Sequence, residues 1–143
     1  MRNTIVETDA YVKTNKDPRS LADADTYRAT TIHELSHRME HSMPQIASLE
    51  ESFIRRRTTT SDGKRERQVN VSGGSKAEAG WADSFPAAYM GRDYSDSKGH
   101  EVLSVGMESL FAGITGGFVG AGKYERDDEC RSFVLGLLAG VRR

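Results

Sequence analysis

The chain has 143 residues, enough for one domain with a single core, and its 20 basic and 21 acidic residues give a net charge of −1. This balance gives no electrostatic basis for binding nucleic acid or a membrane surface, so we expect neither as a partner. Hydrophobic residues make up only 36% of the chain, which indicates a small core with long polar loops. The single cysteine, Cys130, excludes an internal disulfide and a cysteine-based zinc site.

The first part of the chain is predicted to form a strand and two helices. Residues 3–14 alternate apolar and polar side chains, as a short strand does. From about Asp25 to Ser42, apolar residues recur at helical spacing and predict one buried stripe: Ala29, Ile32, Leu35, Met39 and Met43. Pro44 either ends this helix or lies in the first turn of the next. That next helix is expected to turn four side chains inward: Ile46, Leu49, Phe53 and Ile54.

The segment after the second helix is polar and rich in turns. A cluster of basic residues that begins at Arg55, Arg56 and Arg57 is offset by nearby acids, which indicates a solvated helix end. Residues 67–71 can form a short strand, and residues 80–99 are expected to form strand and loop structure packed by aromatic side chains.

Two further helices are predicted, over residues 100–113 and 126–141. The last is expected to turn five apolar side chains to the core: Phe133, Val134, Leu137, Leu138 and Val141. Between these helices, residues 117–124 resemble a phosphate-binding loop, but Tyr124 stands where such a loop needs serine or threonine, so we expect an ordinary loop. No repeat or boundary divides the chain, and we expect one domain over residues 1–143.

The clearest chemical signal is the sequence HELSH at residues 33–37. Positions i and i+4 lie on one face of a helix about one turn apart, so His33 and His37 can hold one metal ion. Glu34 lies on a neighbouring face, from which its carboxylate can reach a metal-bound water without being a ligand. The pattern also occurs by chance in helices, but no proline interrupts this one and an apolar stripe anchors it. We therefore expect a Zn²⁺ site.

A catalytic zinc site usually has three protein ligands and one open position. The downstream candidates for the third ligand are His100, Glu101 and Glu108. Glu101 and Glu108 share one polar face of their predicted helix, and this face can equally well meet a metal or water. Glu40, three residues after His37, is either a hydrogen-bond acceptor for an imidazole or a plain surface residue. His41 lies about 12 Å along the helix from His33, too far to share its metal.

The HELSH motif, followed about 64 residues later by EVLSVGMESLF, resembles the glutamate-ligand, or gluzincin-like, branch of the zincin metallopeptidases. In that branch the third ligand opens an E-x-x-[AS] pattern on a later helix, which residues 101–104 match. The order of motifs over roughly residues 28–140 is similar to zincin-like domains of bacteriophage minor head and head-morphogenesis proteins. Ser36 departs from the glycine that many zincins have there, but it is also small.

The resemblance implies a role for each residue of the motifs. The zinc ligands would be His33, His37 and Glu101, and Glu34 would be the general base. Glu108 would be an outer contact or, as the alternative, the ligand itself.

The resemblance also implies a phenol that faces the oxyanion developing on the substrate. Tyr94 or Tyr89 would supply it, with Tyr94 seven residues before the presumed ligand. Aromatic packing is the alternative for both tyrosines.

We therefore expect an α+β, zincin-like minimal domain, mainly helical, with a small short-stranded sheet and an HExxH active-site helix. Its expected function is that of a zinc-dependent metallopeptidase, in which zinc-activated water attacks a peptide bond and Glu34 acts as general base. A protein or peptide would be the substrate, and phage structural proteins would be further partners. No secretion signal is recognised in the sequence, and we therefore expect the protein in the host cytoplasm or the phage virion.

Two alternatives remain at this stage. One is a non-catalytic structural or interaction protein of a phage virion, which keeps the zincin fold, with or without the zinc. The other is a helical binding domain without metal.

Overall fold

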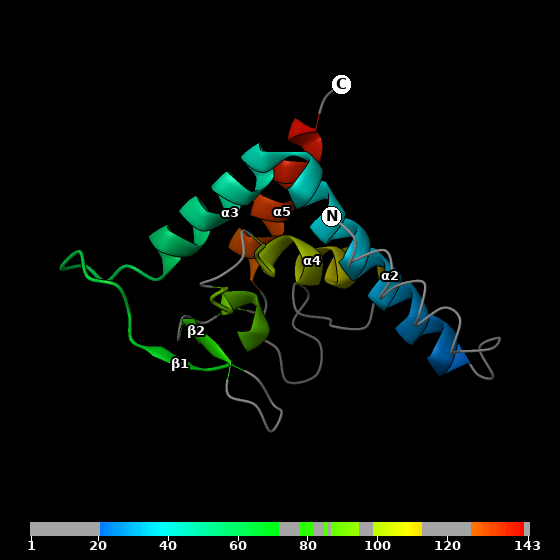
Figure 1. Cartoon of the computed structure of the whole chain (residues 1–143), viewed down its shortest axis with the longest axis horizontal. Coiled ribbons are helices and arrows are strands. Elements are labelled where there is room, and N and C mark those ends of the chain that lie inside the picture. Colours follow the sequence, from blue (N-terminus) through cyan, green and yellow to red (C-terminus); the bar gives the residue numbers. More distant parts are fainter. Residues whose placement is uncertain are drawn as a thin grey trace.

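A computed structural model describes residues 21–71, 78–81, 85, 87–94, 99–112 and 127–141. Its helices are α2 (Leu21–Ser42), α3 (Pro44–Arg57), α4 (Val102–Met107) and α5 (Asp128–Gly140), and a π-helical turn, η2 (Glu108–Ala112), continues α4. A 3-10 turn, η1 (Ala88–Gly91), follows a two-stranded antiparallel sheet of β1 (Gln68–Asn70) and β2 (Ala79–Trp81). The described chain is thus mostly helical with one small sheet (Figure 1). The strand expected over 3–14 and the loop expected over 117–124 lie outside the described residues.

The helices meet at the middle of the described structure. α2 and α3 diverge from their junction at Met43, and α4 and α5 lie between them (Figure 1). Pro44 occupies the first turn of α3, where its missing N–H has no helical acceptor to lose. α4 contacts α2, α5 and η1, so this short helix is the centre of the packing. None of the helices in the described ranges is both long enough and apolar enough to cross a membrane.

The core draws apolar side chains from every helix around α4. The stacked rings of Phe53 and Phe133, with centroids 4.1 Å apart, join α3 to α5. Every residue from Val102 to Gly106 is buried, so α4 has no water-facing side over these positions. The fully buried members of the core cluster are Ile46, Phe53, Ile54, Phe85, Met90, Val102, Leu103, Val105, Cys130, Val134 and Leu137.

Three apolar side chains that were predicted to face the core are exposed instead. Leu35 is 52% exposed, Leu49 50% and Val141 41%. On α3 the inward position next to Leu49 is taken by Glu50, which is completely buried. The physical reason is that the Leu103 N–H in the first turn of α4 needs an acceptor, and Glu50 Oε1 of α3 supplies it at 2.7 Å.

The sequence predicted that Arg57 lies at a solvated helix end, but its side chain is only 10% exposed. Its guanidinium donates to Asp127 Oδ2 at 2.7 Å and lies 4.7 Å from the centre of the Phe85 ring. Asp127 is also the N-cap of α5, accepting the Cys130 N–H at 2.8 Å. One ion pair therefore ties the end of α3 to the start of α5.

Replacing Arg57 by methionine should lower the free energy of unfolding by about 2 kcal/mol, because it removes a charged hydrogen bond at a side chain that is only 10% exposed. Arg56→Met is the matched control. Arg56 pairs with Glu129 across side chains that are 61% and 50% exposed, so its loss should cost less than about 1 kcal/mol. Denaturant unfolding of both variants measures the difference, and equal losses would contradict the role given to Arg57.

Candidate metal centre

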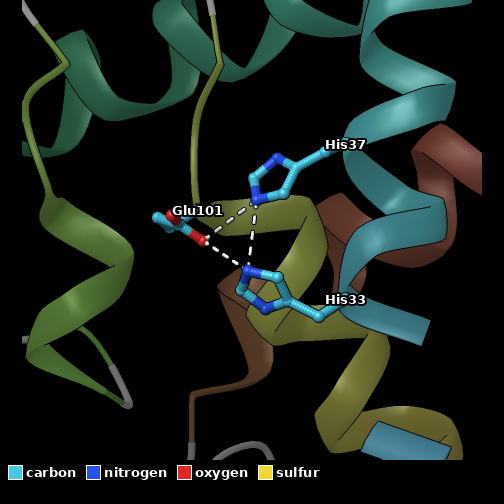
Figure 2. Close-up of side chains that lie close together, drawn as sticks. All are labelled: His33, His37 and Glu101. Carbon is cyan, nitrogen blue, oxygen red and sulfur yellow. Dashed lines mark hydrogen bonds and ion pairs between the residues drawn. The ribbon is translucent and has the colours of Figure 1, made fainter. Parts of the chain in front are cut away.

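Three side chains converge where α2 passes the start of α4. His33 and His37 project from α2 toward the carboxylate of Glu101, the residue that precedes α4 (Figure 2). The two Nε2 atoms are 3.1 Å apart, and Glu101 Oε2 lies 3.3 Å from that of His33 and 3.5 Å from that of His37. These atoms form a group that can hold a metal ion.

The spacing of these three atoms fits a tetrahedral ion. Zinc bonds to imidazole nitrogen and carboxylate oxygen are about 2.0–2.1 Å long, and at the tetrahedral angle they put neighbouring ligand atoms about 3.3–3.4 Å apart. The observed separations of 3.1, 3.3 and 3.5 Å lie around that value. An ion of this size can therefore be held without moving the backbone.

Each imidazole is held from behind by a second carboxylate. His33 Nδ1 lies 2.5 Å from Glu108 Oε1, and His37 Nδ1 lies 2.7 Å from Glu40 Oε2. A carboxylate only accepts hydrogen bonds, so both Nδ1 atoms carry the proton and both Nε2 atoms can offer a lone pair to a metal. Glu40 is 3% exposed, so of its two interpretations the hydrogen-bonded one describes the structure.

In the absence of a metal, the same crowding favours a proton on His37. Burial alone would lower the pKa of His37, but the hydrogen bonds and charges of Glu101 and Glu40 outweigh it and raise the pKa to about 10. Burial would likewise raise the pKa of Glu101, yet the contacts with His37 and Tyr94 bring it down to about 2. The site therefore stabilises positive charge among the three ligand atoms.

Glu101 is itself fixed at both oxygens. The Ser104 hydroxyl donates to Oε2 at 2.7 Å, and the Tyr94 hydroxyl donates to Oε1. Tyr94 in turn accepts from the Arg92 guanidinium at 2.7 Å. Burial and the neighbouring Glu101 carboxylate raise the pKa of Tyr94 above its ordinary value, so its phenol stays a donor.

The structure separates the remaining candidates. Of the two tyrosines, Tyr94 contacts the ligand carboxylate, and Tyr89 lies one step behind it with 3.3 Å between the hydroxyl oxygens. His41 is exposed, and His100 Nε2 lies 3.8 Å from Glu51 Oε2. Neither histidine belongs to the group of potential ligand atoms found among the described residues. Glu34 is half-buried on α2 and forms no hydrogen bond or ion pair with another described residue.

Two residues, Ser104 and Arg92, have contacts at the site to which the sequence analysis assigned no role. Ser104 is the last position of the E-x-x-[AS] pattern, which explains why a small hydroxyl residue suits that place. Arg92 stands between the two tyrosines in the sequence YMGRDY, where its cation lies 4.1 Å from the Tyr94 ring centre. The regular spacing of two tyrosines around one arginine is the signal that would have indicated it.

Comparison with known proteins identifies no similar protein. No protein-family model matches the chain, and neither the curated proteins nor the solved structures include a match. The fold and the site define a mainly helical protein with a candidate metal centre of two histidines and one glutamate.

Substitution should separate the two glutamates that touch His33. Glu101→Gln should reduce zinc affinity by more than the roughly 10–100-fold expected for Glu108→Gln, because the first removes a ligand and the second only an outer contact. A competition titration with a chromophoric chelator measures both. His41→Ala, on an exposed residue of the same helix, is the control and should bind zinc as the wild type does. The reverse order of the two glutamate variants would make Glu108 the ligand.

Proposed function

We propose that this protein is a zinc-dependent metallopeptidase with a zincin-like fold, of the type that HExxH followed by a distant glutamate defines. The observation that carries the proposal is the convergence of His33, His37 and Glu101 at tetrahedral spacing, with both imidazoles held by carboxylates. Two histidines and one glutamate are a ligand set used by zinc peptidases.

The number of ligands supports catalysis over a purely structural ion. Structural zinc sites are closed by four protein ligands, whereas catalytic sites leave one position open. Within the described ranges, three side chains supply ligand atoms, and the two histidine side chains are each 18% exposed. A zinc ion there would polarise the scissile carbonyl and lower the pKa of a water molecule to about 7.

Glu34 has the properties that a general base needs. It follows His33 directly, is half-buried, and is not engaged by another described residue, so its carboxylate remains available to a water molecule. In the proposed reaction it takes the proton of the attacking water and passes that proton to the leaving amine.

The phenol of Tyr94 is the proposed donor to the oxyanion of the substrate. Its hydroxyl already lies at the ligand carboxylate, and Arg92 holds the phenol oxygen from the other side. A phenol has one O–H, so Tyr94 would give up its hydrogen bond to Glu101 Oε1 in order to donate to the oxyanion and stabilise its developing negative charge.

The proposed substrate is a protein or peptide. The resemblance of the motif order to phage minor head and head-morphogenesis proteins makes phage structural proteins the first substrates and partners to test. The alternative function is a structural role in the virion without catalysis, and the Glu34→Gln experiment tests it.

Glu34→Gln should leave zinc binding unchanged and reduce peptide hydrolysis by at least about 100-fold, because it removes the proton acceptor but no ligand. Release of fluorescent fragments from a labelled unfolded protein measures the rate. Chelator should abolish wild-type activity, and added zinc should restore it. A wild-type protein that binds one zinc ion but yields no chelator-sensitive cleavage of such substrates or of phage head proteins would favour the non-catalytic virion role.

The two tyrosines provide a matched pair for the oxyanion donor. At saturating zinc, Tyr94→Phe should lower kcat by roughly 100-fold, as expected for loss of one hydrogen-bond donor to the oxyanion. Tyr89→Phe should have a smaller effect, because Tyr89 reaches Glu101 only through Tyr94 and Arg92. Steady-state kinetics on both variants tests the assignment, and an equal or larger effect at Tyr89 would reverse it.

A further inference from the structure

A second carboxyl group lies behind the metal centre, on a helix that supplies no ligand. Glu50 of α3 is fully buried, and its Oε1 accepts the Leu103 N–H at 2.7 Å. Its other oxygen, Oε2, is also buried and has no hydrogen-bond donor among the described residues. The buried carboxylate of Glu40 is near enough to Glu50 to raise its pKa.

Glu40 has no proton to offer to Glu50. Its Oε2 accepts from His37 Nδ1 at 2.7 Å, and its Oε1 accepts the His100 N–H at 2.8 Å. Two buried carboxylates in contact cannot both be ionised, so the pair holds one proton. Glu40 already receives two N–H groups and Glu50 only one, which leaves the proton on Glu50. Burial, together with the neighbouring Glu40, raises the pKa of Glu50 well above its ordinary value, in agreement with this assignment.

The two glutamates also hold the segment that carries the third ligand. Glu101 precedes α4 and provides no side-chain cap for the free N–H groups at the start of that helix. The His100 N–H is bound by Glu40 of α2, and the Leu103 N–H by Glu50 of α3. Backbone N–H groups before and after Glu101 in the sequence are therefore hydrogen-bonded to carboxyl groups of two other helices.

We propose that Glu50 is a positioning residue of the metal centre: as a neutral carboxylic acid it donates a hydrogen bond to Glu40 and accepts one from Leu103, and so fixes His37 and Glu101 relative to each other. The inference rests on the metal site of the proposed function. It assigns Glu50 no contact with substrate or metal, and its effect passes through Glu40 and the start of α4.

Substitutions at position 50 test both hydrogen bonds. In Glu50→Gln, the amide N–H can donate to Glu40 and the amide oxygen can accept from Leu103, so affinity for Co²⁺ or Zn²⁺ should stay within about threefold of wild type. In Glu50→Met neither hydrogen bond forms. The affinity for metal should then fall by roughly 10–100-fold, as it does when other hydrogen-bond partners that orient a metal ligand are removed. The visible absorption of the Co²⁺ protein should change in Glu50→Met only. Glu51→Met, at the adjacent and 48% exposed residue, is the control and should match wild type.

A second measurement reports the proton directly and does not require Glu50→Met to fold. The infrared difference spectrum of wild type minus Glu50→Gln at neutral pH should contain the carbonyl band of a protonated carboxylic acid.

Several results would overturn the inference. They are a missing acid band, a folded Glu50→Met that binds metal like wild type, or a Glu50→Gln that loses affinity as strongly as Glu50→Met. Wild-type protein that binds no metal would remove the proposed function together with this inference, whereas normal wild-type binding with an unaffected Glu50→Met removes the inference alone.

Discussion

The structure depends on the mutual approach of three electron-pair donors, the Nε2 atoms of His33 and His37 and one oxygen of Glu101, all within 3.5 Å of one another. With their Nδ1 protons committed to carboxylates, both imidazoles turn lone pairs toward this point. Such crowding is unfavourable unless positive charge lies among the three atoms. Protons can supply that charge, but the near-tetrahedral spacing suits a small divalent cation better, because one ion satisfies all three donors at once.

Charge balance explains why the surroundings of the site are so acidic. The carboxylates of Glu40, Glu101 and Glu108 together carry three negative charges, and two neutral imidazoles with a divalent cation reduce the total to one. A fourth ionised carboxyl group at Glu50, buried against Glu40, would add a charge with no counter-ion nearby. A proton on Glu50 removes this excess and also provides the hydrogen-bond donor that Glu40 has room to accept. A divalent cation at the three ligand atoms and a proton on Glu50 would thus be two parts of one electrostatic arrangement.

The sequence was sufficient for features that local spacing determines. The i, i+4 histidines and most helix limits follow from helical geometry, which acts within a few residues. The choice of Glu101 came from the resemblance of its E-x-x-S pattern to zincins. Spacing could not choose between Glu101 and Glu108, because both lie on the face toward His33 and each contacts one of its nitrogens. Helical spacing also could not predict that the Glu50 side chain is buried and the Leu49 side chain exposed. That choice depends on the Leu103 N–H, which is 53 residues away in sequence and becomes a neighbour only after packing.

The hydrogen bonds to the two carboxylate oxygens of Glu101 connect the packing around α4 to the proposed chemistry. Tyr94 takes Oε1 and so leaves Oε2 as the one oxygen directed at the histidines. A carboxylate that offers both oxygens would occupy two positions around an ion, whereas Glu101, held in this way, occupies one. A fourth coordination position would then remain for water or a substrate carbonyl, which a catalytic ion requires and a structural ion does not. Arg92 contributes to the same result, since its contact with the Tyr94 hydroxyl keeps the phenol on Oε1. The Tyr94 O–H would therefore keep the coordination position open before the reaction, and would turn from Glu101 to the oxyanion only as that charge develops.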